Sequence, residues 1–136
     1  MKTTIRLLPL ILLSFISCNN SIQREGLYGK WKYIKVEHPH ISPSDTISSA
    51  DIAEQAPYIV FETNDSLKII WGGKLLSYGT FGTQGQNIKY KEVLPDGKTR
   101  EFPFYVSVLT DNKMVFETMG DEGAKITAVK ATNEHP

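Results

Sequence analysis

Few residues in this sequence could perform chemistry, and they are widely spaced. His38 and His40 flank a proline, so an extended segment could direct both imidazoles to one side, but no third metal ligand is near in sequence. Glu62 and Glu117 stand in two copies of Val-Phe-Glu-Thr, which suggests an acid–base pair, but we interpret both as outward-facing carboxylates at strand ends. No nucleophile, phosphate-loop or metalloprotease motif is present. We therefore predict no catalytic residue, no metal site, no cofactor and no enzymatic activity.

The composition indicates one small folded domain. Of 136 residues, 40% are hydrophobic, and fifteen basic side chains balance fifteen acidic ones. Such a chain is too apolar for disorder, and it has no basic excess with which to neutralise nucleic-acid phosphates. A single cysteine excludes a disulfide framework within the chain and a cysteine-based zinc site.

The first seventeen residues predict a secretory signal. Lys2 and Arg6 stand at its start, and the apolar run from Leu7 to Ile16 is shorter than the roughly 20 residues that span a bilayer. Cys18 follows directly, and the stretch Leu13–Cys18 resembles a bacterial lipobox of the loose Bacteroidetes type. The resemblance implies cleavage before Cys18 and acylation of its sulfur and new amino group. We expect a signal peptide over residues 1–17 and a lipidated tether over residues 18–26.

The residues after the cysteine bear on location. Asn19 replaces the aspartate of the enteric inner-membrane retention signal, and residues 20–23 lack the acidic run associated with surface export. We therefore expect a cell-envelope lipoprotein of the outer membrane that faces the periplasm. Without residues 1–17 the chain has thirteen basic and fifteen acidic side chains, a net charge of −2, which does not attract anionic lipids. The membrane contact would depend on the acylated Cys18.

Residues 27–132 predict an all-β domain. Short segments of alternating apolar and polar residues are separated by turns rich in Asn, Asp and Gly, as in successive hairpins. This pattern favours an eight-stranded up-and-down antiparallel barrel. The first connection, residues 38–57, is the long one, and it contains a short helix over Ser49–Gln55. The expected strands are Lys30–Val36, Tyr58–Thr63, Leu67–Trp71, Lys74–Phe81, Asn87–Val93, Thr99–Leu109, Lys113–Met119 and Ala124–Ala131.

Several positions within these strands predict irregularities or exposure. Pro103 cannot donate a ladder hydrogen bond, so we expect a bulge or an edge there. The apolar phase breaks near Ile34 and near Val129, which predicts bulges whose positions the pattern does not fix. The phase also places Val108 on the same face as Phe104. Lysines alternate with apolar residues on two strands and are expected on the outer faces; they are Lys30, Lys32, Lys35, Lys89 and Lys91.

Two groups of residues resemble lipocalin motifs. The sequence Leu27-Tyr28-Gly29-Lys30-Trp31 resembles the Gly-x-Trp opening of the first lipocalin strand. Phe61 before the turn Asn64-Asp65, and Gly79-Thr80-Phe81 before Gly85, resemble the pattern of small lipocalin-like lipoproteins from Bacteroidetes. The similarity covers about residues 27–131 and implies a lipocalin-like barrel.

The same resemblance implies a structural trio. Lipocalins place an Arg or Lys of a late strand across the tryptophan of the first strand, and Lys130 occupies about that position. Gly29, Trp31 and Lys130 are therefore expected to have structural roles.

The interior of the barrel is the candidate functional region. A barrel of eight strands is just wide enough to be filled by side chains or to hold one small ligand. Our first hypothesis is a binding protein for a small hydrophobic molecule, with the loop around Ile52 over the mouth. The predicted ligand contacts are Tyr33, Phe61, Ile69, Trp71, Tyr90, Phe104 and Phe116, and the remaining lumen lining is Trp31, Leu67, Ile88, Val106 and Met114. The alternative is a solid barrel that acts as an interaction or structural lipoprotein, with the long first loop or a strand edge meeting an envelope protein.

Overall fold

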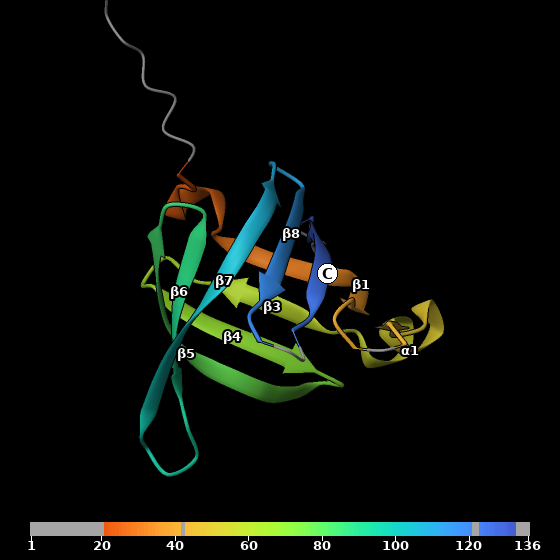
Figure 1. The fold of residues 1–136 in the computed structure, drawn as a ribbon. Coiled ribbons are helices and arrows are strands. Elements are labelled where there is room, and N and C mark those ends of the chain that lie inside the picture. The colour runs from red at the N-terminus through yellow and green to blue at the C-terminus, as the bar shows by residue number, and fades with distance from the viewer. Residues whose placement is uncertain (1–20, 42, 121–122, 133–136) are drawn as a thin grey trace, which may run out of the picture.

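The strands of the chain form one antiparallel sheet that curls until its first and last barrel strands pair (Figure 1). The computed structural model describes residues 21–41, 43–120 and 123–132. The strands are β1 Gly29–His38, β2 Asp45–Thr46, β3 Tyr58–Phe61, β4 Ser66–Trp71, β5 Lys74–Gln84, β6 Asn87–Val93, β7 Thr99–Leu109, β8 Lys113–Thr118 and β9 Lys125–Lys130; the helices are the 3-10 turn η1 Arg24–Gly26 and α1 Ser49–Gln55.

The pairing order confirms the predicted meander. Strands β3 to β9 each pair with their neighbours in sequence, β1 pairs with β3, and β1 also pairs with β9, which closes an eight-stranded barrel. All eight predicted strands are present, and α1 has the predicted bounds. The short strand β2 was not predicted, because two residues are too few to show alternation; it pairs with Glu37 and His38 at the end of β1.

The described part of the predicted tether is fastened to the barrel. The Ile22 backbone N–H donates to the Gly85 carbonyl oxygen over 2.9 Å, and Arg24 forms an ion pair with Asp65 over 3.2 Å. Residues 24–26 form η1, and Leu27 is fully buried. Cys18 and the predicted signal peptide lie outside the described residues.

Among the described residues, the register of the sheet shifts at three places, of which one was predicted. The register between β1 and β9 shifts at Ile34, as expected. Two further shifts leave Leu76 of β5 and Ser107 of β7 without a register partner on β4 and β8. The bulge expected near Val129 is wrong: this residue pairs in regular register with Lys32 on one side and Lys113 on the other.

The bulge at Ser107 also corrects the predicted face of Val108. An extra residue shifts the alternation by one, so Val108 is exposed and Leu109 packs against the core instead. Of the two alternatives predicted for Pro103, a bulge or an edge, the structure shows the edge. Pro103 pairs with Lys89 in regular register, whereas the β7–β8 register begins only at Phe104.

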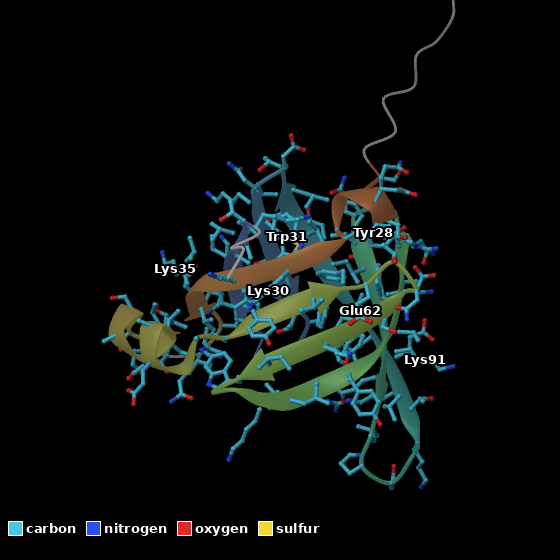
Figure 2. All side chains as sticks on the ribbon, turned by 180° about the vertical axis from the view of Figure 1, so that it is seen from behind. Tyr28, Lys30, Trp31, Lys35, Glu62 and Lys91 are labelled. Carbon is cyan, nitrogen blue, oxygen red and sulfur yellow. The ribbon has the colours of Figure 1, made fainter. Side chains whose placement is uncertain are left out.

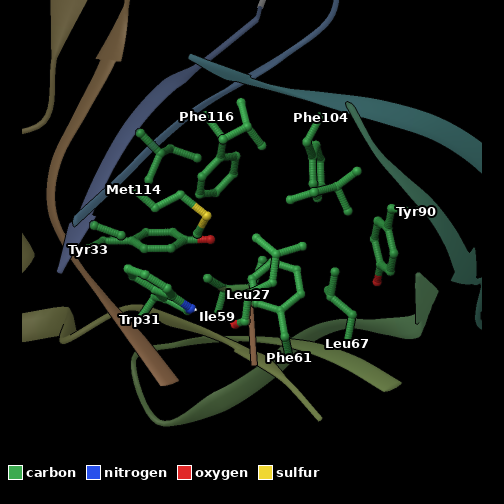
Figure 3. Packing of buried hydrophobic residues seen from close by; sticks show 14 of the residues in the cluster. Leu27, Trp31, Tyr33, Ile59, Phe61, Leu67, Tyr90, Phe104, Met114 and Phe116 are labelled. Carbon is green, nitrogen blue, oxygen red and sulfur yellow. Dashed lines mark hydrogen bonds between the residues drawn. The ribbon is translucent and has the colours of Figure 1, made fainter. Parts of the chain in front are cut away.

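The two ends of the barrel differ. At the closed end, η1 and the residues around it lie against the β3–β4, β5–β6 and β7–β8 turns. At the opposite end, which we call the mouth, lie α1 and the β4–β5 and β6–β7 turns; Figure 1 shows α1 far from the residues that precede β1. Between the ends, apolar side chains from all eight barrel strands converge on one core (Figure 3).

Candidate functional site

A pocket of about 650 Å³ opens at the mouth between β5 and β6. These strands pair from Gly79 to Gln84, with Glu92 facing Gly79, but the first part of β5 pairs only with β4. The wall is therefore open beside residues 74–78 of β5, and we call this opening the seam. The lining residues are Ile69, Leu75, Leu76, Ser77, Tyr78, Tyr90, Glu92, Val93, Leu94, Pro95, Gly97, Arg100, Phe102, Phe104 and Thr118.

Gly79 lies at the base of the seam because the two backbones touch there. A Cβ atom on this residue would lie 1.9 Å from the Lys91 carbonyl oxygen, closer than any side chain tolerates. Glycine thus allows the last close contact between β5 and β6 before the strands separate. This close approach of the two backbones explains why the motif Gly79-Thr80-Phe81 begins with glycine.

Polar side chains bridge the base of the seam. The Ser77 hydroxyl donates to Glu92 Oε2, and since it has one proton, the Tyr90 hydroxyl donates to Ser77 Oγ over 2.6 Å. Arg100 Nε donates to Glu92 Oε1 over 2.8 Å. Both oxygens of Glu92 are thus satisfied, and its side chain is only 13% exposed. Burial raises the pKa of Tyr90 and Glu92 adds to the rise, whereas the Ser77 hydrogen bond and Arg100 oppose it.

Apolar side chains surround this polar cluster. On β7, Phe102 is half-buried and Phe104 is buried, and both rings pack against Tyr90 with centroid separations of 5.3 and 5.5 Å. Leu75 and Leu76 form the exposed edge of the seam on the opposite strand. The pocket therefore combines an apolar lining with a short polar strip, which is typical of small-molecule sites.

The helix α1, which contains Ile52, lies at the mouth end and contributes no residue to the lining of the pocket. Ile52 is buried in the core cluster, and the Ser48 hydroxyl caps the helix by accepting from the Asp51 N–H. The Gly72 N–H in the β4–β5 turn donates to the Gln55 carbonyl oxygen over 2.8 Å. The helix is thus attached to the hairpin beside the pocket.

The seven predicted ligand contacts separate into three groups. Ile69, Tyr90 and Phe104 line the mouth pocket. Tyr33 contacts Trp71 and Phe116 edge to face beneath α1, with centroid separations of 6.4 and 6.0 Å.

Phe61 belongs to the closed end. It packs on Phe81 with a centroid separation of 5.0 Å, and it is almost completely buried. Neither Phe61, Trp71 nor Phe116 lines the mouth pocket.

The predicted structural trio lies together near the closed end. Lys130 Nζ lies 4.6 Å from the centroid of the Trp31 ring, and it donates to the Tyr28 carbonyl oxygen. The Trp31 indole N–H donates to the Leu27 carbonyl oxygen over 2.8 Å. Gly29 has φ +121°, and a Cβ atom there would lie 2.8 Å from Lys130 Cε. Burial lowers the pKa of Lys130, and Asp111 partly offsets this effect.

The residues considered for catalysis and metal binding have other surroundings. Glu62 is ion-paired with Lys68 over 3.3 Å, and Glu117 lies opposite Lys125 and Tyr105 in register. Within the described part of the chain, no three His, Cys, Asp or Glu side chains form a group that could hold a metal ion.

The lysines predicted on the outer faces are exposed. These residues are Lys30, Lys32, Lys35, Lys89 and Lys91. Figure 2 shows Lys30, Lys35 and Lys91 outside the wall, whereas Trp31 points inward.

The polar strip of the pocket was not predicted from the sequence. Glu92 stands two residues after the inward Tyr90, and Arg100 stands two residues before the inward Phe102. Because strand side chains alternate, this parity could have placed both charges inside the wall. The sequence did not indicate that Leu75 and Leu76 border the pocket, since the bulge at Leu76 interrupts the alternation of β5.

Comparison with known proteins supports the fold. No family profile and no curated protein sequence matches the chain. Among solved structures, a lipocalin-like protein from Bacteroides uniformis is similar, with a TM-score of 0.55 and 18% sequence identity over 78% of this chain and 99% of that chain. Together with the closed barrel, this match shows that the fold is lipocalin-like.

Proposed function

We propose that this lipocalin-like barrel is a binding protein that holds a small hydrophobic molecule in the mouth pocket. The observation that carries the proposal is the pocket itself, whose volume of about 650 Å³ falls among ligand sites of roughly 300–1,000 Å³. Ile69, Phe102 and Phe104 would contact the ligand from within the barrel, and Leu75 and Leu76 would cover it from the seam.

The predicted contacts fit this proposal unequally. Tyr90 and Phe104 border the pocket, so the ligand would touch both rings. Tyr33 contacts Trp71 and Phe116 edge to face, and these three rings would serve the site by holding the mouth in shape. Phe61 lies deep in the core and would contribute to stability.

An uncharged fluorescent dye, N-phenyl-1-naphthylamine, tests the pocket. We expect its emission to rise when it binds the purified full chain carrying Cys18→Ala, and we expect Leu76→Ser to weaken binding about tenfold by removing apolar contact. Leu76 is 66% exposed, so the substitution should leave the fold unchanged.

Val108→Ser is the matched control, because Val108 is also exposed on a bulged strand but does not border the pocket. Equal dye affinity in the two variants, or no dye binding to either, would contradict the proposed site.

We also propose that the protein is attached to the outer membrane through acylated Cys18 and faces the periplasm. Two features support this: the lipobox-like sequence, and the attachment of Ile22 to the closed end, from which the anchor would leave the barrel on the side away from the mouth. No helix of the described residues is long and apolar enough to cross a membrane. Cys18→Ala should move the protein from the membrane fraction to the soluble periplasmic fraction; persistent membrane association would exclude this anchor.

A second candidate function is an interaction protein of the envelope. A groove of about 570 Å³ lies on the outer wall between α1 and β1, and its lining includes Lys30, Ile34, Ala53 and Tyr58. Lys30 Nζ lies 3.9 Å from the centroid of the Tyr58 ring, so the groove joins a cation to an apolar floor. A photo-crosslinker at Ala53 should then capture one partner in cells, whereas a crosslinker at Gly97 should not.

A further inference from the structure

The mouth pocket contains one pair of opposite charges. Among the described residues that line it, Glu92 and Arg100 are the charged ones, and they form an ion pair over 2.8 Å. Tyr90 is neutral at physiological pH, since the ordinary pKa of a tyrosine hydroxyl is 10.0 and burial raises the pKa of this one further. The lining as a whole therefore has no net charge.

The two partners of this pair differ in what they can still bind. Each carboxylate oxygen of Glu92 already accepts one hydrogen bond, from Ser77 or from Arg100 Nε, and the side chain is poorly exposed. Arg100 is held by that bond and by the face of Phe102, whose ring centroid is 5.2 Å from its guanidinium carbon. Its two terminal nitrogens have no partner within the described structure, and its side chain is 62% exposed. The pocket thus offers exposed donors from Arg100, whereas the acceptors of Glu92 are each already hydrogen-bonded and only 13% exposed.

The residues along β7 define a direction for a ligand. Arg100 is exposed, Phe102 is half-buried and Phe104 is buried, at alternate positions on the same face of the strand. Four residues of strand span about 13 Å. A molecule with its polar head at Arg100 would therefore extend an apolar chain along Phe102 to Phe104.

The charge on the head decides how well it fits. A carboxylate would accept from Arg100 but would bring a second negative charge beside Glu92, which is poorly exposed and so weakly screened. An ammonium would be repelled by the exposed Arg100 cation before it could approach Glu92, which is only 13% exposed. An uncharged acceptor would receive hydrogen bonds from Arg100 without either repulsion.

We infer that the pocket selects amphiphiles with an uncharged head that accepts hydrogen bonds, such as an alcohol, an ester or an amide. This inference rests on the proposed binding function and names its ligand class. The charge pair is the selective element, and Ser77 is a positioning residue that holds Glu92 in place.

Displacement of N-phenyl-1-naphthylamine by three decyl compounds tests the inference. Near neutral pH, 1-decanol is uncharged, decanoate is an anion and decylamine is a cation, while the alkyl chain is the same. We expect 1-decanol to displace the dye from the Cys18→Ala chain at about tenfold lower concentration than either ion. Equal displacement by all three, or a preference for an ion, would overturn the inference while leaving the binding function intact. Absence of dye binding would overturn both.

Charge variants make the test specific to the pair. Glu92→Gln leaves Arg100 unopposed and should make decanoate the preferred compound, whereas Arg100→Gln should favour decylamine. Glu101→Gln is the matched control, because Glu101 adjoins Arg100 in sequence but pairs with Lys89 on the outer face. If Glu101→Gln changes the order in which the three compounds displace the dye as much as Glu92→Gln does, the charge pair is not the selective element. Should a pocket variant fail to fold, the order of displacement measured with the Cys18→Ala chain, whose pocket is unaltered, still decides whether the inference holds.

Discussion

The closed end and the mouth of this barrel are built from the same strands, yet they are packed differently. At the closed end, Trp31, Phe61 and Leu67 are almost completely buried, Leu27 belongs to the same core cluster, and Ile22 packs against it. At the mouth, β5 and β6 separate, polar side chains bridge the gap, and Leu75 and Leu76 are exposed. Closing one end with the N-terminal segment allows the other end to remain open without loss of the core. The comparison predicts that substitutions at the closed end reduce stability, whereas substitutions at the mouth alter binding.

The two tryptophans give the largest expected contrast. Trp31→Ala should lower the free energy of unfolding by about 4–5 kcal/mol, because it empties a fully buried site and removes a hydrogen bond and a lysine contact. Trp71→Ala at the half-buried mouth should cost about 2 kcal/mol. Urea denaturation monitored by circular dichroism measures both, and equal losses would remove the distinction between the ends.

A second pair separates stability from binding. Phe61→Ala should lower the free energy of unfolding by about 3–4 kcal/mol but leave dye affinity unchanged, because Phe61 packs on Phe81 away from the pocket. Ile69→Ala should cost less stability and weaken dye binding, since Ile69 lines the pocket and is only half-buried. Dye titration and denaturation on the same samples decide this. Weaker binding by the Phe61 variant would show that the two ends are coupled.

Two glycines of β5 sharpen the comparison within one strand. Gly79→Ala should lower the free energy of unfolding by about 2–3 kcal/mol, because the new methyl group meets the Lys91 carbonyl oxygen at the base of the seam. Gly82→Ala should be nearly neutral, since the nearest atom to its added Cβ is an Arg24 nitrogen 3.9 Å away. Thermal unfolding of both variants tests this difference. A neutral Gly79→Ala would mean that the seam widens freely.

The smallest expected effect is an alkaline loss of stability. Burial, with a smaller contribution from Tyr90, raises the pKa of Tyr33 above its ordinary value of 10.0. The neutral, buried Tyr33 hydroxyl therefore contributes fully to stability below pH 10. Above pH 10 this contribution declines, by at most about 1.4 kcal/mol per pH unit.

Tyr33→Phe should make this decline shallower. The variant must be compared with the parent at each pH, because the lowered pKa of Lys130 acts in the opposite direction below its ordinary value of 10.5. Denaturation curves from neutral pH to above pH 10 supply the measurement, and parallel declines would show that Tyr33 ionises freely in the folded barrel.

Local patterns predicted the elements because they depend on neighbouring residues. The alternation of Leu67, Ile69 and Trp71 placed all three on one face, and the turns of Asn, Asp and Gly located the hairpins. The helix α1 is also local, since the Ser48 hydroxyl caps it by accepting from the Asp51 N–H. Where a bulge adds one residue, as at Ser107, the alternation changes face, and the pattern could not show on which strand the extra residue lies.

The sequence by itself determined the eight strands, the helix in the first loop and the inward rows of aromatic residues, since each depends on local chemistry and strand period. Only the tertiary structure decided where the barrel is filled and where it is open. The seam exists because β5 and β6 stop pairing at Gly79, and the pocket depends on that separation. The meeting of Glu92 with Arg100 and Ser77 depends on the register of three strands, which is set by the packing of the whole sheet.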